Sequence, residues 1–427
     1  MKNKIIRSTS SQAHNQARIH LLSPVAALLA LVAVQQQAQA QASDPNPYYI
    51  GISQSFTRDS NAGRVPSYVP EQSQIVSSTG LNAGINQPFG RQRLRVDASV
   101  SNNRYSENSG LNNTGYGLNA NLDWSTIERL SGSLTYSNSE RQANFFSPFS
   151  PNTTERNSQK SEELAAKFLL GGVTILSFTG ELSHRKLGNS SPFYLNQEYS
   201  QTAGGVGVRY RVSGALDAGV ALRMSSGNYP NFQAVPGGFS GDDVKRRDLD
   251  LNATWVPTGL TTVSTRISLS KQTHSLAAVR DFSGLTGTVS VQHKPAGRVS
   301  YAASISRDTG TENSFQSRLG AFGERVETLA DSSQVNTTAQ LTASYELTAK
   351  IQANLSASMV TSQVGISGLP SSGNNTTSAF DIGLTYNPTR NLVIGAGVGV
   401  QQRNTTSTLS SGYRANTMSV SAKYSLQ

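Results

Sequence analysis

Residues 115–137 alternate apolar and polar side chains at every second position, on both sides of a short polar segment at residues 125–129. Successive side chains of a β-strand point to opposite faces, so this period predicts two strands that are each apolar on one face and polar on the other. The polar segment predicts the turn of a β-hairpin. Each arm has about the 9–11 residues that a tilted strand needs to cross a bilayer.

The same amphipathic unit recurs along the chain, and the pattern predicts 18 strands. Short connections, many with Gly or Pro, alternate with long polar ones, as in outer-membrane barrels. A soluble β-sandwich gives no reason for this alternation, and a propeller or β-helix would show a repeat of sequence rather than of hydropathy alone. The sequence therefore predicts an all-β fold, an 18-stranded antiparallel transmembrane β-barrel with short periplasmic turns and long extracellular loops.

The composition agrees with this fold but does not decide it. Charged residues make up 15% of the chain and hydrophobic residues 36%, and there is no cysteine. Half of every barrel strand faces a polar lumen, which explains the polar composition. A closed hydrogen-bonded barrel also needs no disulfide. A soluble β-protein rich in Ser, Thr and Asn would share this composition, so the strand pattern carries the argument.

The N-terminal segment resembles a secretory signal peptide. A basic stretch precedes an apolar core at residues 21–34, and small residues spaced for cleavage end at Ala40 and Ala42. The core is short for a membrane span. We therefore expect a signal peptide at residues 1–42 and an outer-membrane β-barrel domain at residues 43–427, in the outer membrane of a Gram-negative cell.

Six aromatic residues occupy equivalent positions in the predicted strands. Each is the last outward-facing residue of a strand that runs toward the short-turn end. Amphipathic rings at this height form an interfacial girdle in outer-membrane barrels. The alternative is that aromatic residues simply favour strand ends. The predicted periplasmic girdle consists of Trp124, Tyr210, Trp255, Tyr345, Tyr386 and Tyr424.

Three stretches in the first third of the chain suggest a family. They are SFTRDSNAGRVP at residues 55–66, QPFGRQRLRVDASVSNNRY at residues 87–105, and the hairpin with LDW and LSGSLTY. Together they resemble the exosortase-associated exopolysaccharide-biosynthesis outer-membrane barrels (EpsL-like proteins). The resemblance implies a passive conduit through which an exopolysaccharide leaves the cell, working with periplasmic and inner-membrane export components.

The predicted inward faces carry charges of both signs. A barrel of this size is wide enough for an aqueous channel. Guanidinium groups in such a channel suit an anionic polymer. Alternatively, these charges pair across strands and merely solvate the lumen. The candidate lumen residues that contact a polymer are Arg93, Arg95, Asp123, Arg209, Arg211 and Arg223.

Two of the predicted long connections have features of their own. Residues 226–245 contain three aromatic side chains in a polar setting, which predicts a loop. Its rings either pack inward and narrow the mouth of the barrel or stack on sugars, or, as the favoured alternative, pack against neighbouring loops. In residues 307–334, apolar side chains recur at helix-like spacing and predict a short helix. These apolar positions are Leu319, Phe322, Val326 and Leu329.

Enzymatic and nucleic-acid functions are not indicated. Only His184, His274 and His293 follow the predicted signal peptide, and none has an evident catalytic partner in the sequence. No metal-ligand spacing or nucleotide-binding turn is present, so no cofactor is expected. The formal net charge of +10 is not concentrated in a block beyond the N-terminal segment. The expected partners are outer-membrane lipid, a polysaccharide substrate and periplasmic export components.

The expected function is an outer-membrane channel for exopolysaccharide export. Two alternatives remain at this point: a general or substrate-specific diffusion porin, and a plugged structural or adhesive barrel that acts through its loops.

Overall fold

The structure is a computed structural model. It describes residues 47–426, except residues 128, 143–155, 173, 296, 310–314, 320–324, 330–334, 365–372 and 407–411. The predicted signal peptide, residues 1–42, lies outside the described residues. Within the described part of the chain, no helix is long and apolar enough to span a membrane.

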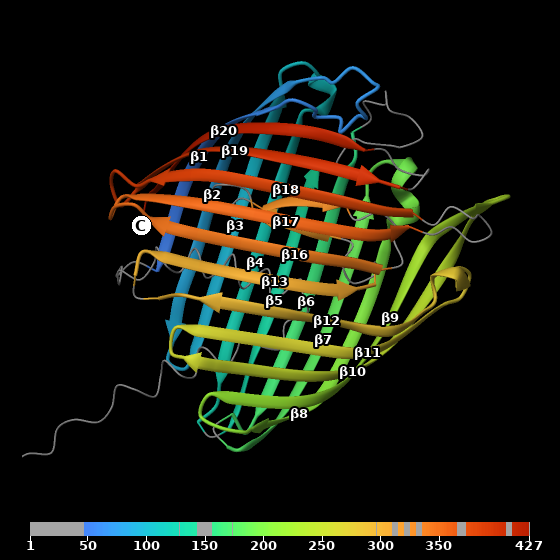
Figure 1. The fold of residues 1–427 in the computed structure, drawn as a ribbon, viewed down its shortest axis with the longest axis vertical. Coiled ribbons are helices and arrows are strands. Elements are labelled where there is room, and N and C mark those ends of the chain that lie inside the picture. Colours follow the sequence, from blue (N-terminus) through green and yellow to red (C-terminus); the bar gives the residue numbers. More distant parts are fainter. Residues whose placement is uncertain are drawn as a thin grey trace, which may run out of the picture.

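Eighteen antiparallel strands form one closed sheet, which confirms the predicted barrel and its strand number (Figure 1). Each strand of this sheet pairs with the sheet's next strand along the chain, so that β13 pairs with β16, and β1 closes the ring against β20. The first ten strands are β1 (Tyr48–Asp59), β2 (Gln74–Phe89), β3 (Gln92–Tyr105), β4 (Asn113–Ser125), β5 (Leu130–Gln142), β6 (Ser158–Leu170), β7 (Leu176–Asn189), β8 (Tyr199–Arg211), β9 (Leu216–Val235) and β10 (Gly238–Thr258). The others are β11 (Thr261–His274), β12 (Phe282–His293), β13 (Val299–Asp308), β16 (Val335–Glu346), β17 (Ile351–Val364), β18 (Gly373–Tyr386), β19 (Leu392–Thr405) and β20 (Tyr413–Leu426).

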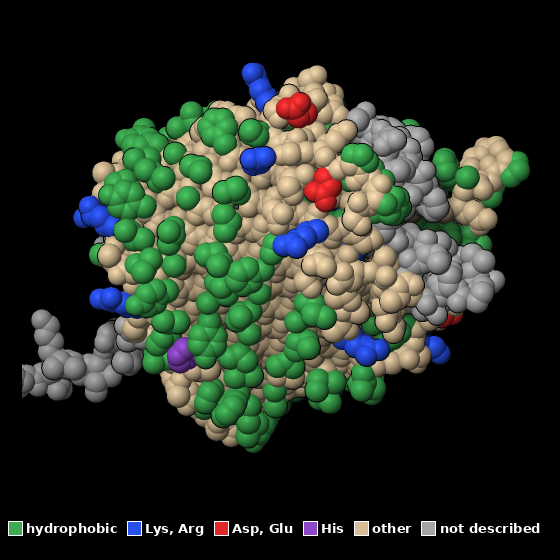
Figure 2. Space-filling model, turned by 45° about the horizontal axis from the view of Figure 1, so that its top comes forward, with side chains coloured by type: hydrophobic (Ala, Val, Ile, Leu, Met, Phe, Trp, Pro, Cys, Tyr) green, Lys and Arg blue, Asp and Glu red, His purple; other side chains and the backbone are tan. Residues whose placement is uncertain are grey.

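The barrel is apolar outside and polar inside, the reverse of a soluble core. Along β1, the side chains of Ile50, Ile52 and Phe56 alternate with polar neighbours and are exposed on the outer face. The fully buried side chains are mostly polar, and the largest of them is Arg246. Figure 2 shows apolar side chains spread over the wall with few charges among them. A closed barrel pairs every backbone N–H and C=O group between strands, which lipid requires, and its apolar side chains face the lipid. The protein is therefore an outer-membrane barrel.

The two ends of the barrel differ in their connections. At one end the strands are joined by segments such as residues 90–91 and 259–260. This end also holds the first residues of β1 and the last residues of β20, since Ile50 pairs with Leu426. The other end has longer connections such as residues 60–73 and 190–198, and the 3-10 helices η1 (Ser109–Leu111), η2 (Pro192–Gln197) and η3 (Ala278–Arg280).

The prediction of a loop at residues 226–245 is wrong. Strands β9 and β10 continue through most of this segment and pair as far as Val235 and Gly238. Gly237 has a φ of 88°, a left-handed conformation that suits the tight turn between them. Most of this extension lies beyond the lipid belt. Both faces of a hairpin there can meet water, so the sequence loses the apolar–polar alternation that marks a strand.

The prediction of a short helix within residues 307–334 is also wrong. Two short strands, β14 (Phe315–Leu319) and β15 (Arg325–Leu329), form an antiparallel hairpin in a separate sheet. Leu319 pairs with Arg325 in its register. The apolar residues of these two strands imitate helical spacing when they are read along the chain. Phe322, part of that prediction, lies outside the described residues.

Candidate functional site

The lumen wall at β3 and β4 is open to solvent. The inward side chains of Asp97, Ser99 and Asn119 are exposed in the middle of their strands, and Asp97 lies opposite Asn119 in the register. On the outer face of the same strand, Ala98 and Val100 are also exposed. Strand β3 is therefore accessible on both faces at one height.

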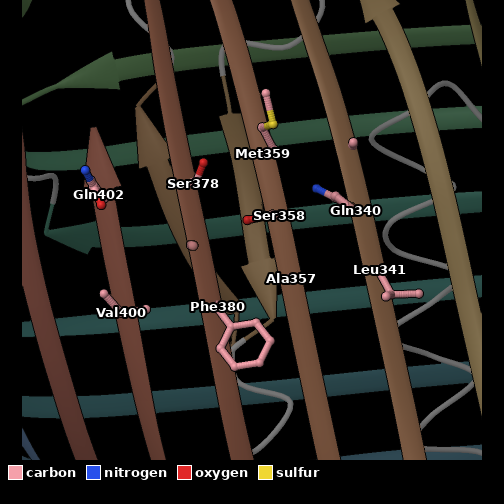
Figure 3. Close-up of a pocket in the computed structure, with 11 residues that line it drawn as sticks. Gln340, Leu341, Ala357, Ser358, Met359, Ser378, Phe380, Val400 and Gln402 are labelled. Carbon is pink, nitrogen blue, oxygen red and sulfur yellow. The ribbon is translucent and has the colours of Figure 1, made fainter. Parts of the chain in front are cut away.

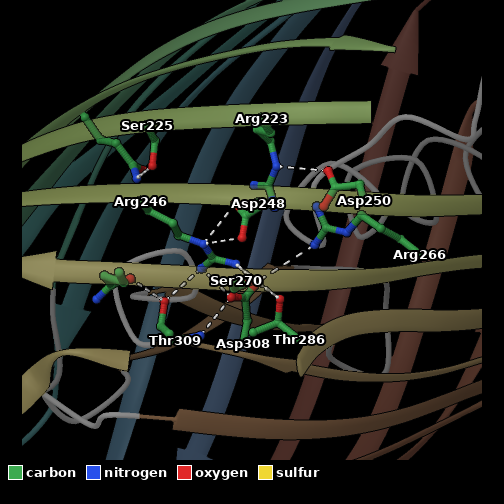
Figure 4. A network of polar contacts seen from close by, with 12 residues as sticks. Arg223, Ser225, Arg246, Asp248, Asp250, Arg266, Ser270, Thr286, Asp308 and Thr309 are labelled. Atoms are coloured by element: carbon green, nitrogen blue, oxygen red, sulfur yellow. Dashed lines mark hydrogen bonds and ion pairs between the residues drawn. The ribbon is translucent and has the colours of Figure 1, made fainter. Parts of the chain in front are cut away.

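On the opposite part of the wall, from β9 to β13, inward charged side chains are buried in a network of ion pairs (Figure 4). The side chain of Arg246 is 1% exposed. Its Nε donates to the Asp248 carboxylate at 2.9 Å, and its Nη1 donates to Asp308 Oδ1 at 2.6 Å. Residues at every second position of a strand share a face, so Arg246, Asp248 and Asp250 all point inward from β10.

The remaining donors of Arg246 are taken up by hydroxyl groups. Nη1 also donates to Thr309 Oγ1 at 2.8 Å, and Nη2 donates to Ser270 Oγ at 3.2 Å and Thr286 Oγ1 at 3.3 Å. A buried guanidinium is tolerated only when its N–H groups have acceptors. The acceptors of Arg246 come from four strands, β10 to β13, and from Thr309, the residue after β13. The side chain of Arg246 therefore links strands β10, β11, β12 and β13 on the inner face of the wall.

Two further arginines complete the network. Arg223 on β9 lies 3.1 Å from an oxygen of Asp248 and 3.3 Å from an oxygen of Asp250. Arg266 on β11 approaches Asp308 at 3.7 Å. The three guanidinium groups and three carboxylates balance, so this part of the wall adds no net charge to the lumen.

The sequence pattern identified Arg223 as a lumen residue but missed Arg246 and Asp308. The signal for Arg246 was present, because it stands two residues before Asp248 on the same strand face. Arg246 directly follows residues 226–245, which the sequence predicts as a loop, so the pattern does not place it on a strand. Asp308 comes from β13 and meets Arg246 only through the closure of the sheet.

Two other predicted lumen arginines also form ion pairs. Arg95 lies 3.3 Å from Asp123 on the neighbouring strand, and Arg211 lies 3.4 Å from Asp217. These contacts match the alternative in which lumen charges pair across strands. Both pairs lie near the short connections, but β3 and β8 are separated by four strands, so the two clusters are not brought together.

Arg93 and Arg209 differ from these paired residues. Arg93 donates from Nε to the side-chain oxygen of Asn86 at 2.8 Å, a neutral partner. Nη2 of Arg209 is buried and has no hydrogen-bond acceptor in the described part of the chain. Neither forms an ion pair within 4 Å with another described residue. Neither guanidinium group is therefore held in an ion pair by a described residue, and both remain available at the short-connection end of the lumen.

The six predicted girdle residues lie on the outer face at the short-connection end. Trp255 pairs with Leu216 at the start of β9, and Tyr386 pairs with Ile351 at the start of β17. The indole of Trp124 packs edge to face against Phe168, with ring centroids 6.2 Å apart. The role of the six residues as a girdle at one membrane interface stays a prediction.

His274 has a partner that the sequence did not reveal. Its Nδ1 lies 2.7 Å from Asp242 Oδ2, and both side chains are buried. The amide of Gln272 faces the other ring nitrogen at 2.9 Å, so no nucleophile stands there. Asp242 also accepts from the backbone N–H of Leu276 at 2.8 Å. The pair anchors the base of the β9–β10 extension to the β11–β12 connection.

The outer wall carries a groove across β16–β19 (Figure 3). Leu341, Met359 and Phe380, which are exposed on the outer face, line it together with the small residues Ala357 and Ser378. Its apolar lining belongs to the lipid-facing surface rather than to the lumen. No group of His, Cys, Asp and Glu suited to a metal ion occurs among the residues that the structure describes.

No protein-family model matches the sequence, and no curated protein matches it significantly. Several solved structures from Pseudomonas aeruginosa are similar in fold. OccK2 (OpdF) matches with a TM-score of 0.47 and 10% identity over 89% of this chain and 98% of that chain. OccK5 (OpdH) matches with a TM-score of 0.43 and 12% identity over the same shares. A mutant of the ferric enterobactin receptor (PfeA) matches with a TM-score of 0.40 and 10% identity over 89% of this chain and 81% of that chain.

Proposed function

We propose that this barrel is a passive channel through which hydrophilic solutes diffuse across the outer membrane. One observation carries the proposal: Asp97, Ser99 and Asn119 are exposed on the inner face of a lipid-embedded wall. The outer face of β3 at this height is covered by lipid, so the exposed inner face indicates water in the lumen. A water-filled lumen is what an 18-stranded barrel is wide enough to hold.

The orientation follows from the two ends. In outer-membrane barrels the short connections face the periplasm and the longer ones face outward. We infer that the six aromatic side chains mark the periplasmic interface. Arg93 and Arg209 then lie toward the periplasmic end of the lumen.

The unpaired arginines favour anionic solutes. A charge in a channel with low-dielectric walls concentrates ions of the opposite sign. Arg93 and Arg209 lack a carboxylate within ion-pair distance among the described residues, whereas Arg95, Arg211 and Arg223 have one. Guanidinium groups bind carboxylates and phosphates through paired hydrogen bonds, so solutes carrying these groups are the expected cargo.

Export of an exopolysaccharide remains the implication of the sequence resemblance. No described contact in the lumen favours a polymer over a small solute. The diffusion channel is therefore the function that the geometry supports best.

Conductance of the mature barrel in a planar bilayer tests the proposal. We expect stepwise insertion of open channels that prefer anions and are unaffected by added polysaccharide. Block by polysaccharide would favour the export function, and a barrel without conductance would contradict both channel functions and favour the plugged barrel.

Two neighbouring substitutions locate the path within the lumen. Ser99→Trp places a large ring on the inner face of β3 and should lower the single-channel conductance. Ala98→Trp adds the same ring one residue away on the outer face and should leave the conductance unchanged. Equal conductance of both variants would show that solutes do not pass along β3.

A further inference from the structure

Two cations lie directly opposite each other on the outer face of the barrel. Arg247 on β10 pairs with Lys271 on β11 in the register, and Lys245 stands two residues before Arg247 on the same face of β10. All three side chains are exposed. We call Lys245, Arg247 and Lys271 the cationic patch.

The patch lies at the edge of the apolar belt, at the end with the long connections. The next outward pair toward the middle of the barrel is Leu249 with Leu269, which are 38% and 59% exposed. Leu251 and Ile267 follow in the same direction and are exposed as well. The outer face of β10 and β11 therefore changes from apolar to cationic within one residue pair.

No protein group within the described structure neutralises the patch. Like charges directly opposite each other on a sheet destabilise it. None of the three cations forms an ion pair with a described residue. The neighbouring carboxylates Asp248 and Asp250 point into the lumen and are bound to arginines there. Asp243, two residues beyond Lys245, accepts a hydrogen bond from the Asn228 amide at 2.7 Å.

Other outward cations at this end of the barrel do not lie opposite a second cation. Four of them face uncharged residues in the register: Arg58, Arg104, Arg307 and Arg414. On β5, β6 and β7, Lys160 lies opposite Glu140, and Lys186 lies opposite Glu162. Each of these cations faces a carboxylate of the protein, as cross-strand pairs usually do. What distinguishes the cationic patch is the direct pairing of one cation with another, Arg247 with Lys271.

We propose that the cationic patch binds the phosphate groups of an anionic glycolipid, lipid A, in the outer leaflet of the membrane. A phosphate accepts paired hydrogen bonds from the guanidinium of Arg247, and the two ammonium groups supply further charge. The acyl chains of such a lipid lie along the exposed leucine and isoleucine side chains below the patch. The proposal rests on the orientation given above, in which the long connections face outward.

Native mass spectrometry of the mature barrel in detergent tests this proposal. The barrel is titrated with diphosphorylated lipid A and, separately, with the same lipid after removal of both phosphates. The test variant is Lys245→Ser/Arg247→Ser/Lys271→Ser. The matched control is Lys160→Ser/Lys186→Ser, which removes outward cations that face a carboxylate.

We expect the wild-type barrel to prefer the phosphorylated lipid, and the test variant to bind it about tenfold or more weakly. The control variant should change affinity by less than about twofold, and the dephosphorylated lipid should bind all three barrels equally. Equal loss in both variants, unchanged binding by the test variant, or no preference for phosphate in the wild type would overturn the proposal.

Conductance of the same preparations separates this proposal from the channel function. The test variant should conduct like the wild type, because the patch lies outside the lumen. A barrel that conducts but shows no preference for phosphorylated lipid contradicts only the lipid site. A barrel that shows the preference but does not conduct contradicts only the channel.

Discussion

Arg95 lies 3.3 Å from Asp123, although the residue directly opposite Asp123 in the register is Arg93. The ion pair therefore runs diagonally between β3 and β4 and leaves Arg93 with the neutral Asn86. Arg211 and Asp217 also form an ion pair, between β8 and β9, but they lie directly opposite each other in the register. The charge that a solute meets at this end of the lumen then depends on the cations outside these pairs.

Removing those cations should change the ion selectivity of the channel. Arg93→Gln/Arg209→Gln removes two positive charges without freeing a bound carboxylate, so it should reduce anion preference, measured as the reversal potential in a salt gradient. The control Arg95→Gln/Asp123→Asn removes one charge of each sign and should leave the reversal potential near that of the wild type. A shift of equal size in the control would show that selectivity does not follow net lumen charge.

Breaking the buried network should destabilise the barrel. Arg246→Met leaves the carboxylates of Asp248 and Asp308 buried without their main partner, which costs about 3–5 kcal/mol. Urea unfolding in detergent micelles measures this loss. Arg247→Met changes the next residue, whose side chain points outward and is exposed, and should stay within about 0.5 kcal/mol. Similar losses in both variants would mean that the network does not stabilise the wall.

The contact of Asp242 with the β11–β12 connection should weaken in acid. Burial alone would raise the pKa of the Asp242 carboxyl, but the backbone N–H of Leu276 and the imidazole of His274 lower it below its ordinary value. A carboxyl with a lowered pKa stabilises the folded state above its unfolded value of about 3.9, and this contribution is lost as the pH falls through the lowered pKa.

Hydrogen exchange of the Leu276 amide follows this contact directly. The amide should be better protected in the wild type than in Asp242→Asn at pH 6, and the difference should disappear only as the pH falls through the lowered pKa of the Asp242 carboxyl, below its ordinary value of about 3.9. Protection that does not depend on Asp242 at pH 6 would contradict the anchoring role.

Both tryptophans should report the same depth in the membrane. The chain has two, so Trp124→Phe and Trp255→Phe each leave a single fluorophore. Lipids labelled with bromine near the headgroup should quench both more strongly than lipids labelled near the end of the acyl chain. Trp255 should be quenched more than Trp124, whose ring packs against Phe168. Strongest quenching by the deep label would place these residues away from an interface.

Most strands were predictable, because lipid and water impose a two-residue period on the chain between them. Leu118, Ala120 and Leu122 of β4 alternate with asparagines, and the strand lies where this pattern predicts. The extension of β9 and β10 was not predictable in this way, since most of it lies beyond the lipid. Strands β14 and β15 were not predictable either, because their apolar residues, read along the chain, imitate the spacing of a helix.

Only part of the candidate site was predictable from the sequence. Parity along each strand correctly suggested which side chains face inward, including Arg95, Asp123 and Arg223. The alternation along a strand does not predict which charged side chains form ion pairs, because ion pairing depends on the stagger between strands and on side-chain rotamers. Arg246 and Asp308 are 62 residues apart and meet at 2.6 Å only because β10 to β13 lie side by side.

The sequence by itself determined the class of fold, since an amphipathic period repeated over 18 strands has few solutions other than a closed barrel in a membrane. Only the tertiary structure decided which lumen charges are paired, which wall is wet, and where cations remain unbalanced on the outer face. The physical reason is range: alternation is set between adjacent residues, whereas electrostatic pairing is set by distances across strands that register and closure alone establish.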